Sequence, residues 1–385
     1  MKILSIDTSC DETACAVTNG TKILSNIIWS QVSAHAKFGG VLPSLAQRMH
    51  SEHIDRVVKQ AINNSQLTIN KIDAIAVTVG PGLSIALGVG VNKAKELAKK
   101  HHKKLIAVNH LEGHILSPLA SPANAQLTMN NPLRGNNLQF PALGLVASGG
   151  NTILVKINKV GSHETLAQTT DDALGEALDK AARMLGLGYP GGAILEKMAR
   201  STRLTRSGQA RRNPYILPIP IVGQEERKIF TYSGLKTAMN RLIETKKPLT
   251  KEKVYNLAAC FQDVAFTHLI RVLRYCIIHK QSLASQSTGK QSLASQGPGN
   301  SSFVIHNLLV GGGVAANVEL RRRLRKLGRE FRISVHFPYS NKLTGDNAAM
   351  IGIAAYFKAQ RGEFVDPDKI DRDPRAKLSH SEAKW

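Results

Sequence analysis

The 385-residue sequence predicts an α/β protein built from two copies of one unit, with a cleft between them. Three apolar runs of strand length followed by a helical pattern occur near the amino terminus, and the same order of segments starts again near residue 143. A polar stretch rich in proline and asparagine, residues 119–139, separates the two copies. Clefts between lobes of this kind are common binding sites for nucleotides.

The first copy is expected in residues 1–133. Its strands are predicted at 2–7, 14–18, 22–29 and 72–79, with a long helix at 44–65. The turn at 8–13 is rich in hydroxyl and carboxylate groups, which suits phosphate and metal, although a solvated hairpin loop is the commoner structure. Gly80-Pro81-Gly82, before the next helix, is a weak candidate for an anion site at a helix N-terminus.

Two histidines four residues apart, His110 and His114, follow an apolar strand at 105–108. On a helix they would lie on one face and could share a divalent metal, although a pair satisfied by ordinary hydrogen bonds explains them equally well. The metalloprotease motif places its glutamate directly after the first histidine. Glu112 stands two residues on, about 200° around the helix. The pair is therefore a metal candidate without a protease's base.

The second copy is expected in residues 134–345. Its strands are predicted at 143–148, 152–158, 164–170 and 304–310, with an amphipathic helix at 174–187. A ten-residue unit that occurs twice at 280–299 indicates a low-complexity insertion at 280–300. Gly311-Gly312-Gly313 permits close approach of a ligand such as a nucleoside. Asp346, at the start of the last long helix, is either a helix cap or a third metal ligand.

The composition favours a polyanionic partner. Lysine and arginine number 51 against 28 aspartates and glutamates, a formal net charge of +23. Nucleic acid is the first candidate and a generally basic proteome the alternative. The basic segment at 198–213 is a natural place for a phosphate backbone, and the lysines that end the helix before residue 105 are either solvated or a further contact. Four unpaired cysteines, no signal peptide and no apolar run of about 20 residues predict a soluble, cytoplasmic protein with no membrane partner.

Nine stretches of the chain, in this order, resemble the universal tRNA threonylcarbamoyltransferase family, called TsaD in bacteria. The stretches are Asp7–Thr13, Gly80–Leu83, His110–His114, Val146–Thr152, Asp171–Lys180, Tyr189–Gly192, Ser233–Thr237, Gly311–Asn317 and Asp346–Met350. The resemblance implies a duplicated actin/Hsp70-like fold whose first lobe is joined by the helix at 346–362, followed by a basic polar tail at 363–385. It also implies transfer of a threonylcarbamoyl group from threonylcarbamoyl-AMP to N6 of the adenosine 3′ of the anticodon, in tRNAs reading codons that begin with A.

The resemblance also implies roles for individual residues. It assigns one metal, usually Fe(2+) and sometimes Zn(2+), to His110, His114 and Asp346. Ser9, Asp11 and Glu12 would face the reacting group as catalytic residues, with Asp11 or Glu12 taking the proton of the attacking amine. The residues expected to bind the adenylate are Val146, Ala147, Ser148, Gly149, Gly150, Asp179, Gly192, Glu196 and Asn317.

Members of the family act on tRNA and, in bacteria, work with the proteins TsaB and TsaE, whereas mitochondrial members can act as homodimers. Two other functions compete with the transferase. A metalloendopeptidase is disfavoured by the position of Glu112. A non-catalytic ATP-binding scaffold would keep the glycine-rich loops but would not need two histidines and an aspartate converging on a metal.

Overall fold

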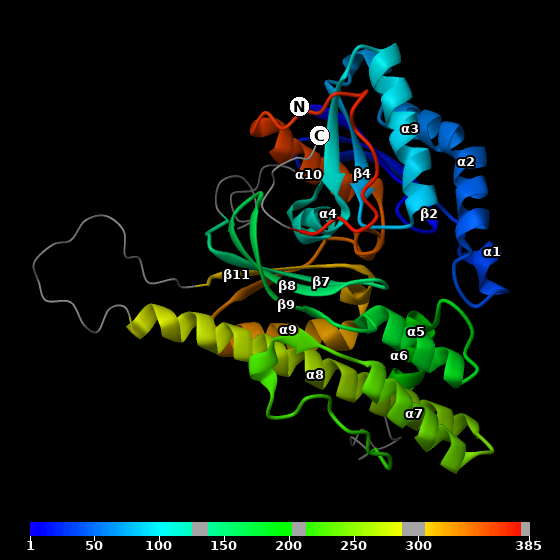
Figure 1. Cartoon of the computed structure of the whole chain (residues 1–385), viewed down its shortest axis with the longest axis vertical. Coiled ribbons are helices and arrows are strands. Elements are labelled where there is room, and N and C mark those ends of the chain that lie inside the picture. The colour runs from blue at the N-terminus through cyan, green and yellow to red at the C-terminus, as the bar shows by residue number, and fades with distance from the viewer. Residues whose placement is uncertain (125–137, 202–212, 287–304, 379–385) are drawn as a thin grey trace, which may run out of the picture.

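Two six-stranded sheets, one from each half of the chain, form the centre of the molecule (Figure 1). The computed structural model describes residues 1–124, 138–201, 213–286 and 305–378. Most of the predicted boundary at 119–139 and of the basic segment at 198–213 lies outside the described residues, as do residues 287–300 of the predicted insertion.

The first sheet has the strand order β5-β4-β1-β2-β3-β6. Its strands are β1 (Lys2–Asp7), β2 (Glu12–Asn19), β3 (Lys22–Ser30), β4 (Ala74–Gly80), β5 (Lys104–Asn109) and β6 (Ser121–Pro122). β1, β2 and β3 are antiparallel neighbours, whereas β4 runs parallel to both β1 and β5. Because β2 begins two residues earlier than predicted, Glu12 lies on a strand and the predicted polar turn is shortened to residues 8–11.

The second sheet repeats the first, with the order β10-β9-β8-β7-β11-β12. Its strands are β7 (Ala142–Ala147), β8 (Thr152–Lys159), β9 (Ser162–Thr169), β10 (Ile229–Phe230), β11 (Asn307–Gly311) and β12 (Ser334–His336). Without the two-residue edge strands, the order 5-4-1-2-3 of the first sheet recurs as 12-11-7-8-9, with the same parallel and antiparallel pairs. The predicted duplicated α/β architecture is confirmed.

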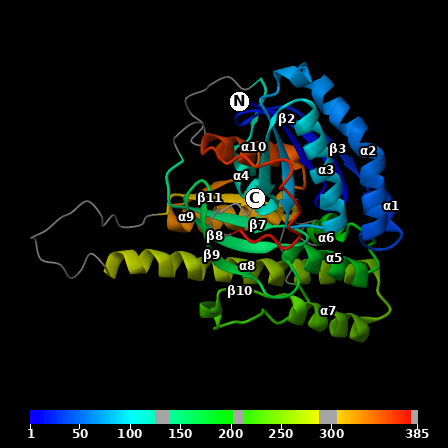
Figure 2. The same cartoon turned by 45° about the horizontal axis from the view of Figure 1, so that its top comes forward.

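The helices form three layers around these sheets (Figures 1 and 2). The outer face of the first sheet carries α2 (Pro43–Asn64) and α3 (Ser84–Lys100), with the short α1 (Val32–Ala36) before them. The middle layer, between the sheets, consists of α4 (His110–Leu116) and α10 (Ala348–Gln360). The outer layer of the second sheet contains α5 (Leu174–Met184), α6 (Gly191–Ser201), α7 (Ser233–Lys246), α8 (Lys251–Gln286) and α9 (Val318–Phe331). Single 3-10 turns lie at Ile69–Lys71, Ser117–Leu119, Glu225–Arg227, Gly313–Ala316 and Asn341–Leu343.

Strand alternation distributes β1 between two cores. Leu4 and Ile6 pack into the apolar cluster under α2 and α3, whereas Ile3 packs into the inner cluster around α4 and α10. Ser5 shares the inner face, where its hydroxyl donates a hydrogen bond to the Ala348 carbonyl of α10 at 2.6 Å. The first eight residues of α10 are all buried, which agrees with a helix that is apolar on every side and lies between two sheets.

Residues 363–378, here called the C-terminal strap, return along the first sheet after α10. The Val365 amide donates to the Leu105 carbonyl at 2.9 Å, and the Asp373 amide donates to the Val79 carbonyl at 2.7 Å. Ile370 is fully buried among the residues under α2 and α3. The strap thus packs against the first sheet, although residues 363–385 were expected to form a basic polar tail. None of the described helices combines the length and the apolarity needed to cross a membrane.

Candidate metal centre and catalytic turn

The helix that carries both histidines starts where β5 ends. Asn109 caps it, because its side-chain Oδ1 accepts hydrogen bonds from the Leu111 amide at 2.9 Å and the Glu112 amide at 3.4 Å. All seven residues of α4 are buried between the two sheets. The Asn109 amide nitrogen also donates to the Lys377 carbonyl of the strap at 3.2 Å, so the strap supports the start of this helix.

His110 and His114 lie on one face of α4, as predicted, with their ring centroids 4.7 Å apart. Oδ1 of Asp346 lies 3.4 Å from Nε2 of His110 and 3.1 Å from Nε2 of His114. One ligand atom from each of the three residues lies within 4.8 Å of the others, and no other such group of three occurs among the described residues. The cap of α10 is Asn347, whose Oδ1 accepts from the Met350 amide, so the alternative that Asp346 is only a cap is wrong.

The two imidazoles share one carboxylate, but their pKa values are shifted in opposite directions. Burial disfavours a charge on either ring, yet the carboxylates of Asp346 and Asp7 raise the pKa of His110 to about 10. Burial lowers the pKa of His114. The hydrogen bond to Asp346 opposes this shift, but the positive charge of the neighbouring His110 adds to it. Burial alone would raise the pKa of Asp346, but His110 and His114 hold it well below the usual range.

This arrangement fits a divalent metal. Nδ1 of both histidines is buried without a hydrogen-bond partner, while both Nε2 atoms turn toward one carboxylate oxygen. Two imidazoles and one carboxylate are a donor set used for Zn²⁺ in hydrolases and for Fe²⁺ in non-haem oxygenases. A cation among the three ligands would take the place of the hydrogen bonds that now join them.

Glu112 lies away from these ligands. It is 6% exposed, its Oε1 atom has no hydrogen-bond partner, and its surroundings include Lys358 and Arg361 at the end of α10. Burial raises its pKa. The prediction that Glu112 cannot act as a base at the metal site is therefore supported by its position.

Of the predicted catalytic residues, Ser9 and Asp11 lie in the turn between β1 and β2, and Glu12 is the first residue of β2. Thr8 fixes the turn to α3, because its hydroxyl accepts from the Gly90 amide at 3.2 Å and an ideal Cβ at Gly90 would meet that hydroxyl at 2.5 Å. Ser9 Oγ and Asp11 Oδ2 are buried without hydrogen-bond partners. Burial, and then the charges of Asp11 and Asp346, raise the pKa of Glu12 well above its ordinary value. The turn and Glu12 therefore lie near Asp346, the candidate third metal ligand.

The turn at Gly80-Pro81-Gly82, a weak candidate for an anion site, packs against the C-terminal strap. The Gly82 amide donates to the Pro374 carbonyl at 3.2 Å, and the Leu83 amide donates to the Ser9 carbonyl at 2.8 Å. An ideal Cβ at Gly80 would lie 1.8 Å from the Asp373 carbonyl oxygen. These glycines leave room for the backbone of the C-terminal strap. The amide of the next residue, Leu83, holds the Ser9 carbonyl.

The loop expected to hold the adenylate is accessible only at its tip. Val146 and Ala147 belong to β7 and are fully buried. Ser148 closes a tight turn, since its amide donates to the Asn151 carbonyl at 2.8 Å. Gly149 and Gly150 are exposed, and an ideal Cβ at either would meet nothing within 4 Å. The open backbone at these two glycines is the part of the loop that can face a ligand.

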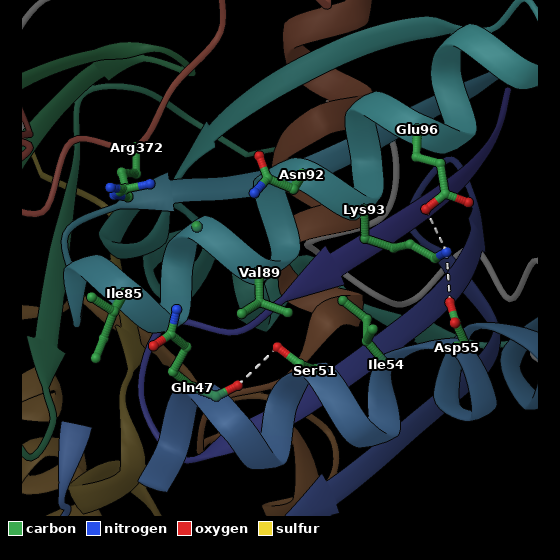
Figure 3. A pocket seen from close by; sticks show the side chains of 11 residues that line it. Gln47, Ser51, Ile54, Asp55, Ile85, Val89, Asn92, Lys93, Glu96 and Arg372 are labelled. Carbon is green, nitrogen blue, oxygen red and sulfur yellow. Dashed lines mark hydrogen bonds and ion pairs between the residues drawn. The ribbon is translucent and has the colours of Figure 1, made fainter. Parts of the chain in front are cut away.

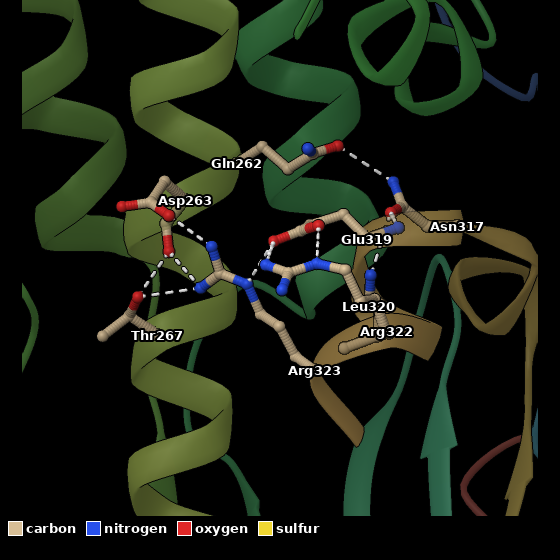
Figure 4. A network of polar contacts seen from close by, with 8 residues as sticks. All are labelled: Gln262, Asp263, Thr267, Asn317, Glu319, Leu320, Arg322 and Arg323. Atoms are coloured by element: carbon tan, nitrogen blue, oxygen red, sulfur yellow. Dashed lines mark hydrogen bonds and ion pairs between the residues drawn. The ribbon is translucent and has the colours of Figure 1, made fainter. Parts of the chain in front are cut away.

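The other residues expected to bind the adenylate come from α5, from α6 and from the residue that precedes α9. Asp179 accepts from the Gly192 amide at 2.7 Å, and burial raises its pKa. Glu196, on α6, accepts from the Val318 amide at 2.9 Å. Asn317 caps α9, and its amide nitrogen donates to Gln262 of α8 at 2.9 Å (Figure 4). The fold brings these residues together, but each bonds to the protein's own groups.

A polar network behind Asn317 anchors α9 to α8 (Figure 4). Glu319, only 4% exposed, accepts hydrogen bonds from Arg322 and Arg323. Arg323 also donates to the Thr267 hydroxyl at 2.9 Å. Pairing of the buried carboxylate with two guanidinium groups compensates its desolvation and fixes the first turn of α9.

The triple glycine has two separate uses. An ideal Cβ at Gly311 would lie 2.0 Å from the His114 carbonyl oxygen, and one at Gly312 would lie 2.3 Å from the Ala147 carbonyl oxygen. Gly313 has nothing within 4 Å. The first two glycines therefore allow the end of β11 to pack against α4, the helix that carries the two histidines, and against β7. Of the three, only Gly313 leaves space for a ligand.

Sequence reasoning missed two residues of the site, Tyr189 and Asp7. Tyr189, from the second lobe, has its pKa raised by burial and by the nearby charge of Asp11 in the first lobe. Asp7 is 1% exposed and lies 3.7 Å from His110. Both stand inside stretches that carry the family resemblance, and strand alternation along β1 was the available signal for Asp7.

A separate groove of about 390 Å³ lies between α2 and α3 (Figure 3). It is largely polar, and Lys93 crosses it to pair with Asp55 and Glu96. None of the predicted site residues lines it. The groove therefore belongs to a different surface from the metal centre.

Comparison with known proteins identifies the family of this chain. The family model of TsaD, tRNA N6-adenosine threonylcarbamoyltransferase, matches residues 22–353. Proteins of that name from Brucella ovis and Bartonella tribocorum are 40% and 41% identical, each over 98% of this chain and 94% of the relative. The crystal structure of full-length HypF in its phosphate- and nucleotide-bound form has a similar fold, with a TM-score of 0.50 at 12% identity over 94% of this chain and 56% of that one. The chain belongs to the tRNA N6-adenosine threonylcarbamoyltransferase family.

Proposed function

We propose that this protein transfers the threonylcarbamoyl group of threonylcarbamoyl-AMP to N6 of the adenosine 3′ of the anticodon, in tRNAs reading codons that begin with A, and releases AMP. The observation that carries the proposal is the convergence of His110, His114 and Asp346 beside the turn that holds Ser9 and Asp11. The net charge of +23 supports a tRNA substrate, whose phosphates attract lysine and arginine. A tRNA substrate supports a cytoplasmic location.

The donor is a mixed anhydride and is already activated, so the enzyme needs mainly to position the reactants and stabilise charge. When bound, a divalent metal would supply a Lewis acid for the phosphate or carbonyl oxygen. The adenosine amine attacks the carbamoyl carbon, the bond from that carbon to the phosphate oxygen breaks, and AMP leaves with the electron pair. The amine also loses one proton.

The turn between β1 and β2, with Glu12 after it, supplies groups that could stabilise the developing negative charge and accept the proton of the amine. The unpaired hydroxyl of Ser9 is available to donate a hydrogen bond to the oxygen that gains negative charge. Asp11 and Glu12 are the candidates to accept the proton of the amine. Burial and the nearby charges of Asp11 and Asp346 raise the pKa of Glu12, so its carboxylate binds a proton more readily than that of an ordinary glutamate.

The open backbone at Gly149, Gly150 and Gly313 supports binding of the AMP portion across the cleft between the lobes. We assign the first lobe to residues 1–133 with the helix at 346–362, and the second to 134–345. Fe²⁺ is the first candidate for the metal and Zn²⁺ the second, on the basis of the two-histidine, one-carboxylate donor set. TsaB and TsaE are the proposed protein partners.

The test is a nucleoside mass-spectrometry assay with the full-length protein, threonylcarbamoyl-AMP and unmodified tRNA, with and without the proposed partners. Wild type should form threonylcarbamoyladenosine and His110→Ala should form none. Glu112→Gln should retain turnover, because Glu112 faces away from the metal. Cleavage of casein that requires Glu112 would favour the endopeptidase, and inactivity in every partner combination would favour the scaffold.

A further inference from the structure

Asp7, which the mechanism above does not use, lies where the first sheet meets the metal helix. It is the last residue of β1, and alternation along the strand puts its side chain on the same face as Ile3 and Ser5, toward α10 and α4. β1 and β5 run in the same direction with β4 between them, so Asp7 and His110 meet at one edge of the sheet. β4 ends at the same edge, at Gly80.

The two carboxylate oxygens of Asp7 have different surroundings. Oδ1 accepts a hydrogen bond from the Ser9 amide at 3.2 Å and so holds the catalytic turn. Oδ2 is buried and has no hydrogen-bond partner, and the same is true of Nδ1 of His110. These two atoms are 3.7 Å apart. A hydrogen bond between them needs a distance of about 2.7–3.2 Å, which a small rotation of the imidazole would provide.

The two unpaired atoms complement each other chemically. Unpaired buried polar atoms are rare in proteins and cost free energy, so each needs an explanation. A histidine that binds a metal through Nε2 carries its proton on Nδ1, and an acceptor for that proton fixes both the tautomer and the orientation of the ring. Oδ2 of Asp7 is such an acceptor, and it is already in place beside Nδ1 of His110.

We propose that Asp7 is a positioning residue that joins the metal ligand His110 to the catalytic turn, with Oδ2 accepting from Nδ1–H of His110 and Oδ1 accepting from the Ser9 amide. The inference rests on the proposed metal at His110, His114 and Asp346. Metal binding then orders the turn that holds Ser9 through a single carboxylate. Nδ1 of His114 has no hydrogen-bond partner in the described part of the chain, so this support is given to His110 alone.

The test uses Asp7→Asn in the full-length protein. Asparagine has nearly the same shape but only one acceptor oxygen, so it can serve the Ser9 amide or the His110 ring, not both. We expect the affinity of the metal-free protein for Co²⁺, measured against a competing chelator, to fall about 10–100-fold, with a changed Co²⁺ absorption spectrum. The matched control is Asp73→Asn, because Asp73 accepts from the Lys2 amide at 2.7 Å beside the opposite end of β1. It should leave affinity and spectrum unchanged.

The outcomes separate this inference from the proposed function. Failure of the wild type to bind Co²⁺ would reject the metal centre itself. Binding by wild type and Asp7→Asn with equal affinity and identical spectra would overturn the role of Asp7 and leave the metal centre standing. If Asp7→Asn does not fold, proton NMR of the Zn²⁺-loaded wild type decides. An imidazole Nδ1–H resonance protected from exchange and lost in His110→Ala supports the role, and its absence overturns it.

Discussion

Replacement of Gly311 by alanine tests whether the metal helix is held in place by backbone contact with the second sheet. The added Cβ would lie 2.0 Å from the carbonyl oxygen and 2.7 Å from the carbonyl carbon of His114. Both atoms belong to the backbone, so no side-chain rotation can relieve the contact. Because real Cβ atoms essentially never approach closer than 3.0 Å, β11 and α4 must separate by at least about 1 Å.

This displacement sets the expected size of the effect. Overpacking of a close-packed interior typically costs about 1–3 kcal/mol of unfolding free energy. A misplacement of about 1 Å in a catalytic arrangement can lower the rate about 10²-fold. We therefore expect Gly311→Ala to lower both the melting temperature and the affinity for metal, and to reduce threonylcarbamoyladenosine formation about 10²-fold.

The control is Gly313→Ala, two residues along the same segment. An ideal Cβ at Gly313 meets nothing within 4 Å, so thermal stability and metal affinity should match the wild type. Melting is followed by scanning fluorimetry, metal affinity by titration of the metal-free protein, and turnover by nucleoside mass spectrometry. Wild-type stability and turnover in Gly311→Ala would refute the close contact between β11 and α4.

Three further predictions concern the site and its support. His110→Ala should abolish metal binding and turnover while Glu112→Gln retains both, measured by metal titration and product formation; loss of both in Glu112→Gln would contradict the geometry of α4. Burial lowers the pKa of His268 in the folded protein to about 4. As the pH falls, the unfolded state therefore binds a proton before the folded state does, and the unfolding free energy should decrease between pH of about 6.5 and 4. This fall should be smaller in His268→Gln in urea titrations at each pH, and equal slopes would reject the burial argument. Ile370→Ala in the C-terminal strap should lower the unfolding free energy by about 2–5 kcal/mol in urea titration, because Ile370 is fully buried. Lys369→Ala is the control, because Lys369 is exposed beside it, and it should leave the unfolding free energy unchanged. Equal stability of the two variants would mean that the strap does not pack as described.

The C-terminal strap gives these predictions a common structural context. Its Lys377 carbonyl accepts a hydrogen bond from the side chain of Asn109, which caps α4. Its Pro374 carbonyl accepts one from the amide of Gly82, next to the turn that holds Ser9. Both halves of the candidate site are therefore supported by one segment at the end of the chain. Destabilisation of the strap should reduce activity as well as stability.

Local patterns in the sequence determined much of this protein. The apolar runs predict the strands because a strand exposes alternate residues to each face, and the order of these runs predicts the duplication that the two sheets display. The spacing of His110 and His114 places them on one helical face because a helix turns once in about 3.6 residues. The same geometry turns Glu112 away from the metal. Each of these conclusions depends on residues close together in the chain.

Tertiary structure alone decided which distant groups complete the site. Asp346 is 232 residues from His114, and only the packing of α10 against α4 distinguishes a ligand from a cap. Glycine patterns likewise do not specify whose atoms fill the space above them. At Gly80 and Gly311 the protein's own backbone fills that space, and at Gly149 it stays open. A short motif encodes backbone freedom and side-chain direction, whereas the partner that meets it is set by the packing of whole helices and sheets.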